Sequence, residues 1–252
     1  MMGIRLFVHS IRMVFENLGE ALRIFGVLYL PFAAATLTSG LFLQGQDPLI
    51  VMFGDGWSIS RIMASVAVLF ISVALLIWMA IGWHRYVLCG ERTTRLVPRL
   101  DRERFTAYLL RSVIVTFIMA LLFACSMFIF FLLGFMFRNM PFVMTGAAFV
   151  LIFLIIVLVY RLSPILPAVA VDHPLSTGEA LVATRHAKMA IAVLTIVSLI
   201  GSAILQATLF LVTALPVVAV LWAVTINWIG TVVGVAILTT IYGHYVEGRP
   251  LA

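Results

Sequence analysis

Long runs of uncharged, mostly apolar residues alternate along the chain with short stretches that carry the charges. A helix rises 1.5 Å per residue, so crossing roughly 30 Å of hydrocarbon takes about 20 apolar residues. Four runs have this length, and they lie between Arg23 and Asp47, Arg61 and Arg85, Arg111 and Arg138, and Arg138 and Arg161. They are apolar at consecutive positions, whereas strands of a membrane barrel alternate in polarity. The pattern therefore predicts transmembrane helices.

A fifth uncharged run, residues 189–246, is too long for one helix and fits two helices joined by a turn. Pro216 is suited to that turn, because proline ends a preceding helix and is tolerated in the first turn of the next. The prediction is an all-α polytopic membrane protein with six spans, forming one integral membrane domain over residues 1–252. We expect the spans to pair as hairpins over residues 24–84, 106–160 and 189–243.

Composition agrees with this pattern. Of the 252 residues, 64% are hydrophobic and 10% are charged, against about 45–50% and about 25% in soluble domains. The mean hydropathy is +1.20. The charges are too few to cover the surface of a water-soluble particle of this size. An ordinary soluble globular protein is therefore excluded.

The positions of the cations predict the orientation in the membrane. With six spans, both termini lie on the same side, and that side carries 14 of the 16 Lys and Arg residues. The opposite loops carry only Arg61 and Arg138. Cytoplasmic loops collect Lys and Arg, so we expect both termini in the cytoplasm. This placement also accounts for the net charge of +6 without a nucleic-acid partner.

Residues 1–22 precede the first span and are interrupted by Arg5, Arg12 and Glu16. These charges are too closely spaced for the apolar core of a signal peptide. Apolar residues recur every three or four positions, namely Ile4, Phe7, Ile11, Val14, Phe15, Leu18 and Leu22. The spacing predicts an amphipathic helix lying in the cytoplasmic interface.

Each predicted hairpin follows a possible helix cap, at Asn17, Asp101 or Ser176. Asn17 and Ser176 have Glu three residues later, as a capping box requires. The return helices also end alike, with aromatic and basic residues in 83–87, 159–162 and 243–246. The similarity predicts three parallel hairpin repeats. The alternative is that any membrane hairpin needs a cap and an aromatic and basic belt at this face.

Cations recur at the predicted cytoplasmic ends of the hairpins. The members of this basic ring are Arg85, Arg161, Arg185 and Lys188, with His84 and Tyr86 beside the first. Such side chains suit anionic headgroups, so membrane phospholipids are the expected partners. As an alternative, the ring is a topology signal without specific lipid recognition.

Few side chains in the spans could support chemistry. No Asp, Glu, Lys or Arg is expected at depth, and Gln206 and Asn227 are the deepest polar groups. Amides in membranes commonly make interhelical hydrogen bonds. We choose Asn227 first, and Gln206 with it, as candidate functional intramembrane groups.

Metal and disulfide chemistry is not indicated. The five histidines all map to the predicted cytoplasmic side, but no His-Glu-x-x-His or His-x-x-x-His pair places two imidazoles on one helical face. We expect no metal and no other cofactor. Cys89 and Cys125 are predicted to be two free thiols.

Two local motifs bear on helix packing. Gly230 and Gly234 form a Gly-x-x-x-Gly pattern, which lets two helices approach closely. We favour contact with a neighbouring helix of the same chain over a dimer seam. Pro164 and Pro167 are expected to end or bend the fourth span.

Several strings resemble a diffuse group of bacterial six-helix inner-membrane proteins, which includes the membrane domain attached to some glycerophosphodiester phosphodiesterases. These strings are Leu-Pro-Ala-Val at 166–169, Gly-Glu-Ala-Leu at 178–181, Trp-His-Arg-Tyr-Val at 83–87, and residues 242–249. The resemblance implies a bacterial inner-membrane location and a link to phospholipid or envelope homeostasis. The sequence lacks the soluble phosphodiesterase barrel, so that activity is not expected.

We therefore predict a non-enzymatic, lipid-associated or scaffold component of the bacterial inner membrane. The alternative is a channel or transporter for an uncharged or lipid-like solute, using a cleft between hairpins. A metal-dependent enzyme at the histidines is a distant third. The sequence does not identify a protein partner.

Overall fold

The computed structural model describes residues 2–43, 59–92, 97–137 and 139–251. Over these ranges the chain is all-helical and forms no strand. The long helices are α2 (Leu18–Leu43), α4 (Ile59–Cys89), α5 (Arg102–Met136), α6 (Pro141–Leu162), α9 (Lys188–Ala207) and α10 (Pro216–Tyr245). The shorter elements are α1 (Met2–Glu16), α7 (Ile165–Ala170), α8 (Thr177–Ala183) and the 3₁₀ turns η1 (Arg185–Ala187) and η2 (Thr208–Leu211).

Five segments of the described chain are long and apolar enough to cross a membrane. They are Met63–Cys89, Arg102–Met136, Phe142–Ala170, Arg185–Leu211 and Pro216–Tyr245. The remaining predicted span coincides with α2, whose side chains at 35–43 lie outside the described residues. The loop with Asp47 and Asp55, and Arg138, also lie outside them. The structure thus agrees with a multi-pass membrane protein.

The predicted turn at Pro216 is confirmed, and Pro141 is placed in the same way. α6 begins at Pro141 and α10 begins at Pro216, each at the position where a missing amide hydrogen costs least. α6 ends at Leu162, and after Ser163 and Pro164 the short helix α7 follows, so this proline interrupts the helix within the apolar segment Phe142–Ala170.

The three predicted caps differ from one another. Asp101 accepts from the amides of Glu103 and Arg104 at the start of α5, and Ser176 forms a complete capping box with Glu179 at α8. Asn17 does not make the predicted box; its amide donates to the Met13 carbonyl, and its oxygen accepts from the Tyr86 hydroxyl. Moreover, Ser176 opens a short helix, which η1 separates from the span α9.

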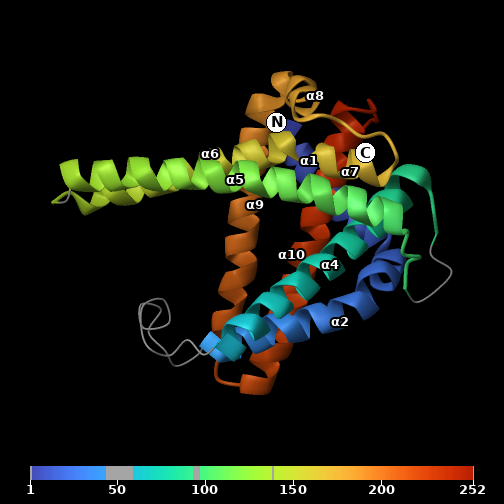
Figure 1. The fold of residues 1–252 in the computed structure, drawn as a ribbon, viewed down its shortest axis with the longest axis horizontal. Helices are drawn as coiled ribbons and strands as arrows, with labels where there is room; N and C mark the ends of the chain where they lie inside the picture. Colours follow the sequence, from blue (N-terminus) through green and yellow to red (C-terminus); the bar gives the residue numbers. More distant parts are fainter. Residues whose placement is uncertain (1, 44–58, 93–96, 138, 252) are drawn as a thin grey trace.

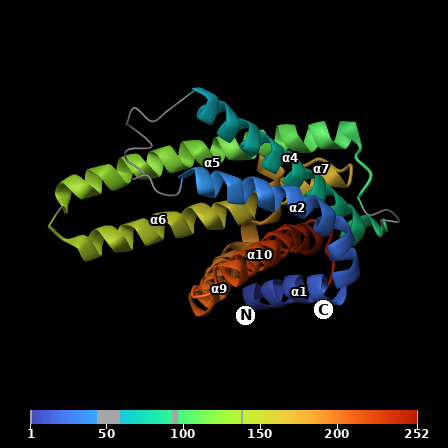
Figure 2. The same ribbon diagram turned by 90° about the horizontal axis from the view of Figure 1, so that it is seen from below.

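Three helix pairs extend from one end of the molecule: α2 with α4, α5 with α6, and α9 with α10 (Figures 1 and 2). We call that end, where both termini, α7 and α8 lie, the junction. The α5–α6 pair runs across the direction of α9 and α10, so the pairs diverge instead of forming a parallel bundle. In the most apolar 18-residue stretch of each of the segments Arg102–Met136 and Phe142–Ala170, no residue is buried. Beyond the junction, most of the surface of this pair is therefore not covered by the rest of the described chain.

The core lies at the junction. Trp83, Phe25 and Met79 are fully buried there between α2 and α4, and the Trp83 and Phe25 rings meet edge to face at 6.0 Å. Far from the junction the side chains are exposed and apolar, as Phe135 and Phe142 illustrate. Apolar surface of this extent suits contact with lipid.

The amphipathic helix at the amino terminus is confirmed as α1, but it ends at Glu16 rather than near residue 22. Gly3, Leu6, Ser10 and Val14 are its buried residues. They recur every three or four positions and so form one face, which packs on α9 and α10. Ser10 Oγ lies 2.9 Å from Thr240 Oγ1 of α10. α1 is therefore fixed to the third helix pair.

Candidate functional site

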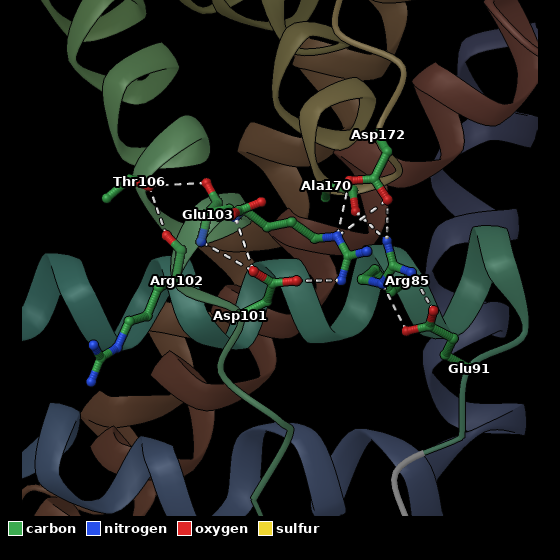
Figure 3. Close-up of polar contacts among 9 residues, drawn as sticks. Arg85, Glu91, Asp101, Arg102, Glu103, Thr106, Ala170 and Asp172 are labelled. Atoms are coloured by element: carbon green, nitrogen blue, oxygen red, sulfur yellow. Dashed lines mark hydrogen bonds and ion pairs between the residues drawn. The ribbon is translucent and has the colours of Figure 1, made fainter.

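Asp172 is the centre of an ion-pair network at the junction (Figure 3). One carboxylate oxygen accepts from Nε of Arg104 at 2.9 Å, and the other accepts from Nη1 of Arg85 at 3.2 Å. Arg104 also pairs with Asp101 at 2.8 Å, and Arg85 pairs with Glu91. The network joins the carboxyl end of α4, the amino end of α5 and the turn after α7.

The backbone at Asp172 is unusual for a residue with a side chain. Its φ is +64°, in the left-handed region that glycine usually fills after a helix. The turn is held by the amide of His173, which donates to the Ala168 carbonyl at 2.9 Å. A left-handed residue other than glycine costs about 1 kcal/mol, and aspartate tolerates it better than most. Glycine would relax the backbone but would remove the carboxylate that joins the two arginines.

Hydrogen bonds from arginines lower the pKa values of two carboxyl groups that lie outside the spans. Hydrogen bonding to Arg104 lowers the pKa of Asp172, and hydrogen bonding to Arg85 lowers the pKa of Glu91. Both carboxyls are therefore ionised at neutral pH, and the network is intact there.

Arginines also cap helices that are distant in the sequence. Arg85 donates to the carbonyl of Ala170 at the end of α7, at 2.9 Å. Arg161 donates to Leu181 in α8 at 3.1 Å, and Arg249 donates to Leu88 in α4 at 2.7 Å. The last carbonyls of a helix lack partners within the helix and carry its negative dipole end, so a cation there is stabilising.

The members of the predicted basic ring therefore have different environments. Arg85 and Arg161 are partly buried and bonded to the protein. Arg185 and Lys188 are exposed, and Nε of Arg185 lies 2.7 Å from Nε2 of His186. The ring residues that remain available to a headgroup are thus Arg185 and Lys188.

His84 and Tyr86, which flank Arg85, also form hydrogen bonds within the protein. His84 is fully buried; its Nδ1 lies 2.8 Å from Thr239 Oγ1, and its Nε2 lies 3.3 Å from the Tyr108 hydroxyl. Tyr86 donates to Asn17 Oδ1 at 2.6 Å. The expectation that His84 contacts a headgroup is wrong, because the core covers its imidazole. Sequence spacing does not reveal that this face of α4 points toward α10.

A cleft of about 720 Å³ lies between α9 and α10, bordered by α1 and α6. Its walls are mainly apolar, with Phe7 and Ile11 from α1 and Ile156 from α6. Exposed Phe15 and Ile204 on its border leave it accessible from outside. At the end away from the junction, Trp222 of α10 donates to Thr208 Oγ1 of η2 at 2.8 Å. The cleft thus runs within two apolar spans.

Both predicted intramembrane polar residues line this cleft. Asn227 donates to the Ala223 carbonyl at 2.8 Å, a bond within α10 and not between helices. Gln206 has no hydrogen-bond partner among the described residues. Hydroxyls of Ser198, Ser202 and Thr231 line the same cleft. Apolar walls with a few polar groups are typical of sites for amphiphilic small molecules.

The favoured prediction that Gly230 and Gly234 pack closely against a helix of the same chain is wrong. A Cβ added at either position would meet nothing within 4 Å, and both glycines line the cleft. The close approach occurs elsewhere: a Cβ on Gly3 of α1 would lie 2.7 Å from the Leu194 nitrogen and closer still to the Ala190 oxygen of α9. The Gly-x-x-x-Gly pattern therefore gives no information on which face of a helix meets another helix.

Cysteines and potential metal ligands complete the chemistry of the described chain. Cys89 and Cys125 are free and exposed, which confirms the prediction of two free thiols. Within the described ranges, no three His, Cys, Asp or Glu side chains come together in a group able to hold a metal ion. In comparisons with protein families, curated proteins and solved structures, nothing matches the chain.

Proposed function

We propose that the chain is a non-enzymatic, lipid-associated protein of the bacterial inner membrane that binds a lipid in the cleft between α9 and α10. The proposal includes six spans, with the junction and both termini in the cytoplasm. The cleft is the observation that carries it. At about 720 Å³ it falls within the size range of small-molecule sites, about 300–1,000 Å³.

The position of the cleft supports a lipid as its occupant. The walls belong to the apolar segments Arg185–Leu211 and Pro216–Tyr245, so a molecule that reaches the cleft from the side comes from the bilayer. An acyl chain fits the apolar walls, and Gln206 and Asn227 offer hydrogen bonds to an ester or hydroxyl group. No Asp, Glu, Lys or Arg lines the cleft among the described residues, which argues against a charged occupant.

Cations at the junction support the association with phospholipid. Arg185 and Lys188 are exposed where α9 begins. A cation near an anionic membrane surface contributes about 1 kcal/mol to binding. The sequence resemblance to bacterial six-helix inner-membrane proteins points to the same setting, and we retain it as part of the proposal.

The second candidate is transport of an uncharged or lipid-like solute. The polar groups of the cleft favour it, because Gln206, Asn227 and three hydroxyls on two helices could pass such a molecule between them. Binding is required for either function, so a binding measurement comes first.

The experiment fills the cleft. Because a Cβ at Gly230 or Gly234 meets nothing within 4 Å, a G230L/G234L variant places two side chains in the cleft whose Cβ atoms fit without displacing a neighbour. The matched control is Gly146→Leu on the exposed face of α6, where a Cβ also meets nothing and which lies outside the cleft. Native mass spectrometry of protein purified in mild detergent counts the retained lipids.

We expect the filled variant to retain at least one lipid fewer than the wild type, and G146L to match the wild type. Equal retention by all three proteins, with unchanged melting temperatures, contradicts a lipid site in the cleft. Uptake of a fluorescent lipid analogue into proteoliposomes then separates transport from binding.

A further inference from the structure

A second cavity, of about 830 Å³, lies at the junction between the end of α4 and the start of α5. We call it the arginine pocket. Five arginines line it, namely Arg85, Arg92, Arg99, Arg102 and Arg104, against the carboxylates of Glu91 and Asp101. Its other lining residues are Ile81, Gly82, Val97, Pro98 and Leu100. It shares no residue with the cleft.

Both carboxylates of the pocket already form ion pairs with arginines. Glu91 pairs with Arg85, and Asp101 pairs with Arg104 and caps α5. The other three arginines are exposed, and their guanidinium groups have no ion-pair or hydrogen-bond partner among the described residues. Figure 3 shows Arg102 extended away from the network. Three like charges around one cavity repel each other, so a bound anion would stabilise the pocket.

The segment that carries Arg99 is anchored rather than loose. The Trp78 indole nitrogen donates to the Pro98 carbonyl at 3.1 Å. Pro98 also packs on α4 so closely that a Cβ on Gly82 would lie 3.2 Å from its ring. Arg102 is the first residue of α5, whose start is fixed by the Asp101 cap. Two of the three arginines therefore extend from fixed backbone, which lowers the entropic cost of binding.

We propose that the arginine pocket binds the phosphate of a phosphomonoester. The planar fork of guanidinium matches two phosphate oxygens, and a dianionic phosphomonoester offers more acceptors and charge than a phosphodiester. The phosphate can belong to a lipid headgroup or to a soluble molecule. The apolar lining residues, and the location where Met63–Cys89 ends and Arg102–Met136 begins, place either source at the membrane surface.

The test uses the full chain in phosphatidylcholine nanodiscs. One arm titrates glycerol 3-phosphate by calorimetry. The other adds phosphatidic acid, a lipid phosphomonoester, or phosphatidylglycerol, a phosphodiester, and compares their retention by native mass spectrometry. The variant R92Q/R99Q/R102Q removes the three unpaired charges. The control R5Q/R12Q/R23Q removes three charges from α1 and α2, outside the pocket.

We expect the wild type and control to bind a phosphomonoester at least tenfold more tightly than R92Q/R99Q/R102Q. Binding of glycerol 3-phosphate identifies a soluble source, and binding of phosphatidic acid alone identifies a lipid. A further variant, R92K/R99K/R102K, keeps the charge without the fork and should bind with intermediate affinity.

The proposal is overturned if the folded Gln variant binds both ligands as the wild type does, or if the wild type binds neither. It is also overturned if phosphatidylglycerol is retained as well as phosphatidic acid. None of these outcomes bears on lipid binding in the cleft, because the cleft and the arginine pocket share no residue. In the same way, G230L/G234L alters no residue of the arginine pocket. The two proposals can therefore fail separately.

Discussion

At the scale of single residues, the sequence predicts where the arginines of the junction lie but not which groups they contact. The sequence indicates that Arg85 and Arg161 lie at helix ends, and they do. It does not indicate that their guanidiniums meet carbonyls of α7 and α8, because those partners lie 85 and 20 residues away along the chain. Asp172 stands before His173 and Pro174, a sequence that suits a turn, but its role in joining Arg85 and Arg104 depends on tertiary contacts.

Acid should loosen the junction through Asp172 and Glu91. Their pKa values are lowered in the folded state by the arginines, so their stabilising contribution is present above the ordinary carboxyl range of about 4 and is lost as pH falls through the folded values. The melting temperature should therefore be level from pH 8 to pH 5 and fall below about pH 4.

Asp172→Asn is the matched variant for this prediction, since asparagine also tolerates a positive φ. It should lower stability at pH 7 by about 1 kcal/mol or less, as exposed ion pairs do, and it should reduce the acid-induced fall. A fall of the same size in D172N would show that other groups cause it.

At the scale of elements, the face of α1 predicted from its apolar pattern differs from the face that packs in the structure. Its helical period is evident from the sequence, but the predicted apolar face includes Ile4 and Phe15, which are exposed, and omits Gly3 and Ser10, which are buried. Small residues let α1 approach α9 closely, and a hydrophobicity pattern does not rank small residues highly. Periodicity therefore predicted the helix but misplaced the face that packs.

Gly3→Val should detach α1 from α9, because a Cβ there would overlap the α9 backbone. Overpacking of this kind typically costs about 1–3 kcal/mol. Hydrogen exchange should rise along residues 2–16 while the rest of the chain keeps its protection. Gly19→Val is the control, since a Cβ at that position meets nothing within 4 Å. Unchanged exchange in G3V would contradict this account of the α1 contact.

At the scale of the whole molecule, sequence reasoning predicted the helical class and the proline boundaries well. These depend on local rules of length, hydropathy and backbone chemistry. The divergence of the three pairs and the presence of the cleft were not predictable, because both depend on which apolar faces of equal hydropathy meet. Depth in the spans is the only reason to single out Gln206 and Asn227 from the sequence, and the structure places both at the cleft between α9 and α10.

The native cysteines test the proposed orientation. Cys89 is exposed where α4 ends at the junction, whereas Cys125 lies within the apolar segment of α5. With the junction in the cytoplasm, a membrane-impermeant maleimide should label Cys89 in inside-out vesicles and not in intact spheroplasts. Cys125 should stay unlabelled in both, and C89S should remove the signal. Labelling of Cys89 in intact spheroplasts would show that the junction faces away from the cytoplasm and would contradict the proposed orientation.

The central claim is that the cleft between α9 and α10 holds a lipid. The most direct measurement is an experimental structure of the wild-type chain in a lipid environment, determined together with G230L/G234L. The account predicts elongated non-protein density between Phe7 and Asn227 in the wild type, with a polar end within hydrogen-bond distance of Gln206 or Asn227, and its loss in the variant. Packing of α9 directly against α10 in the wild type, with no space between Gly230 and the facing residues of α9, would contradict it.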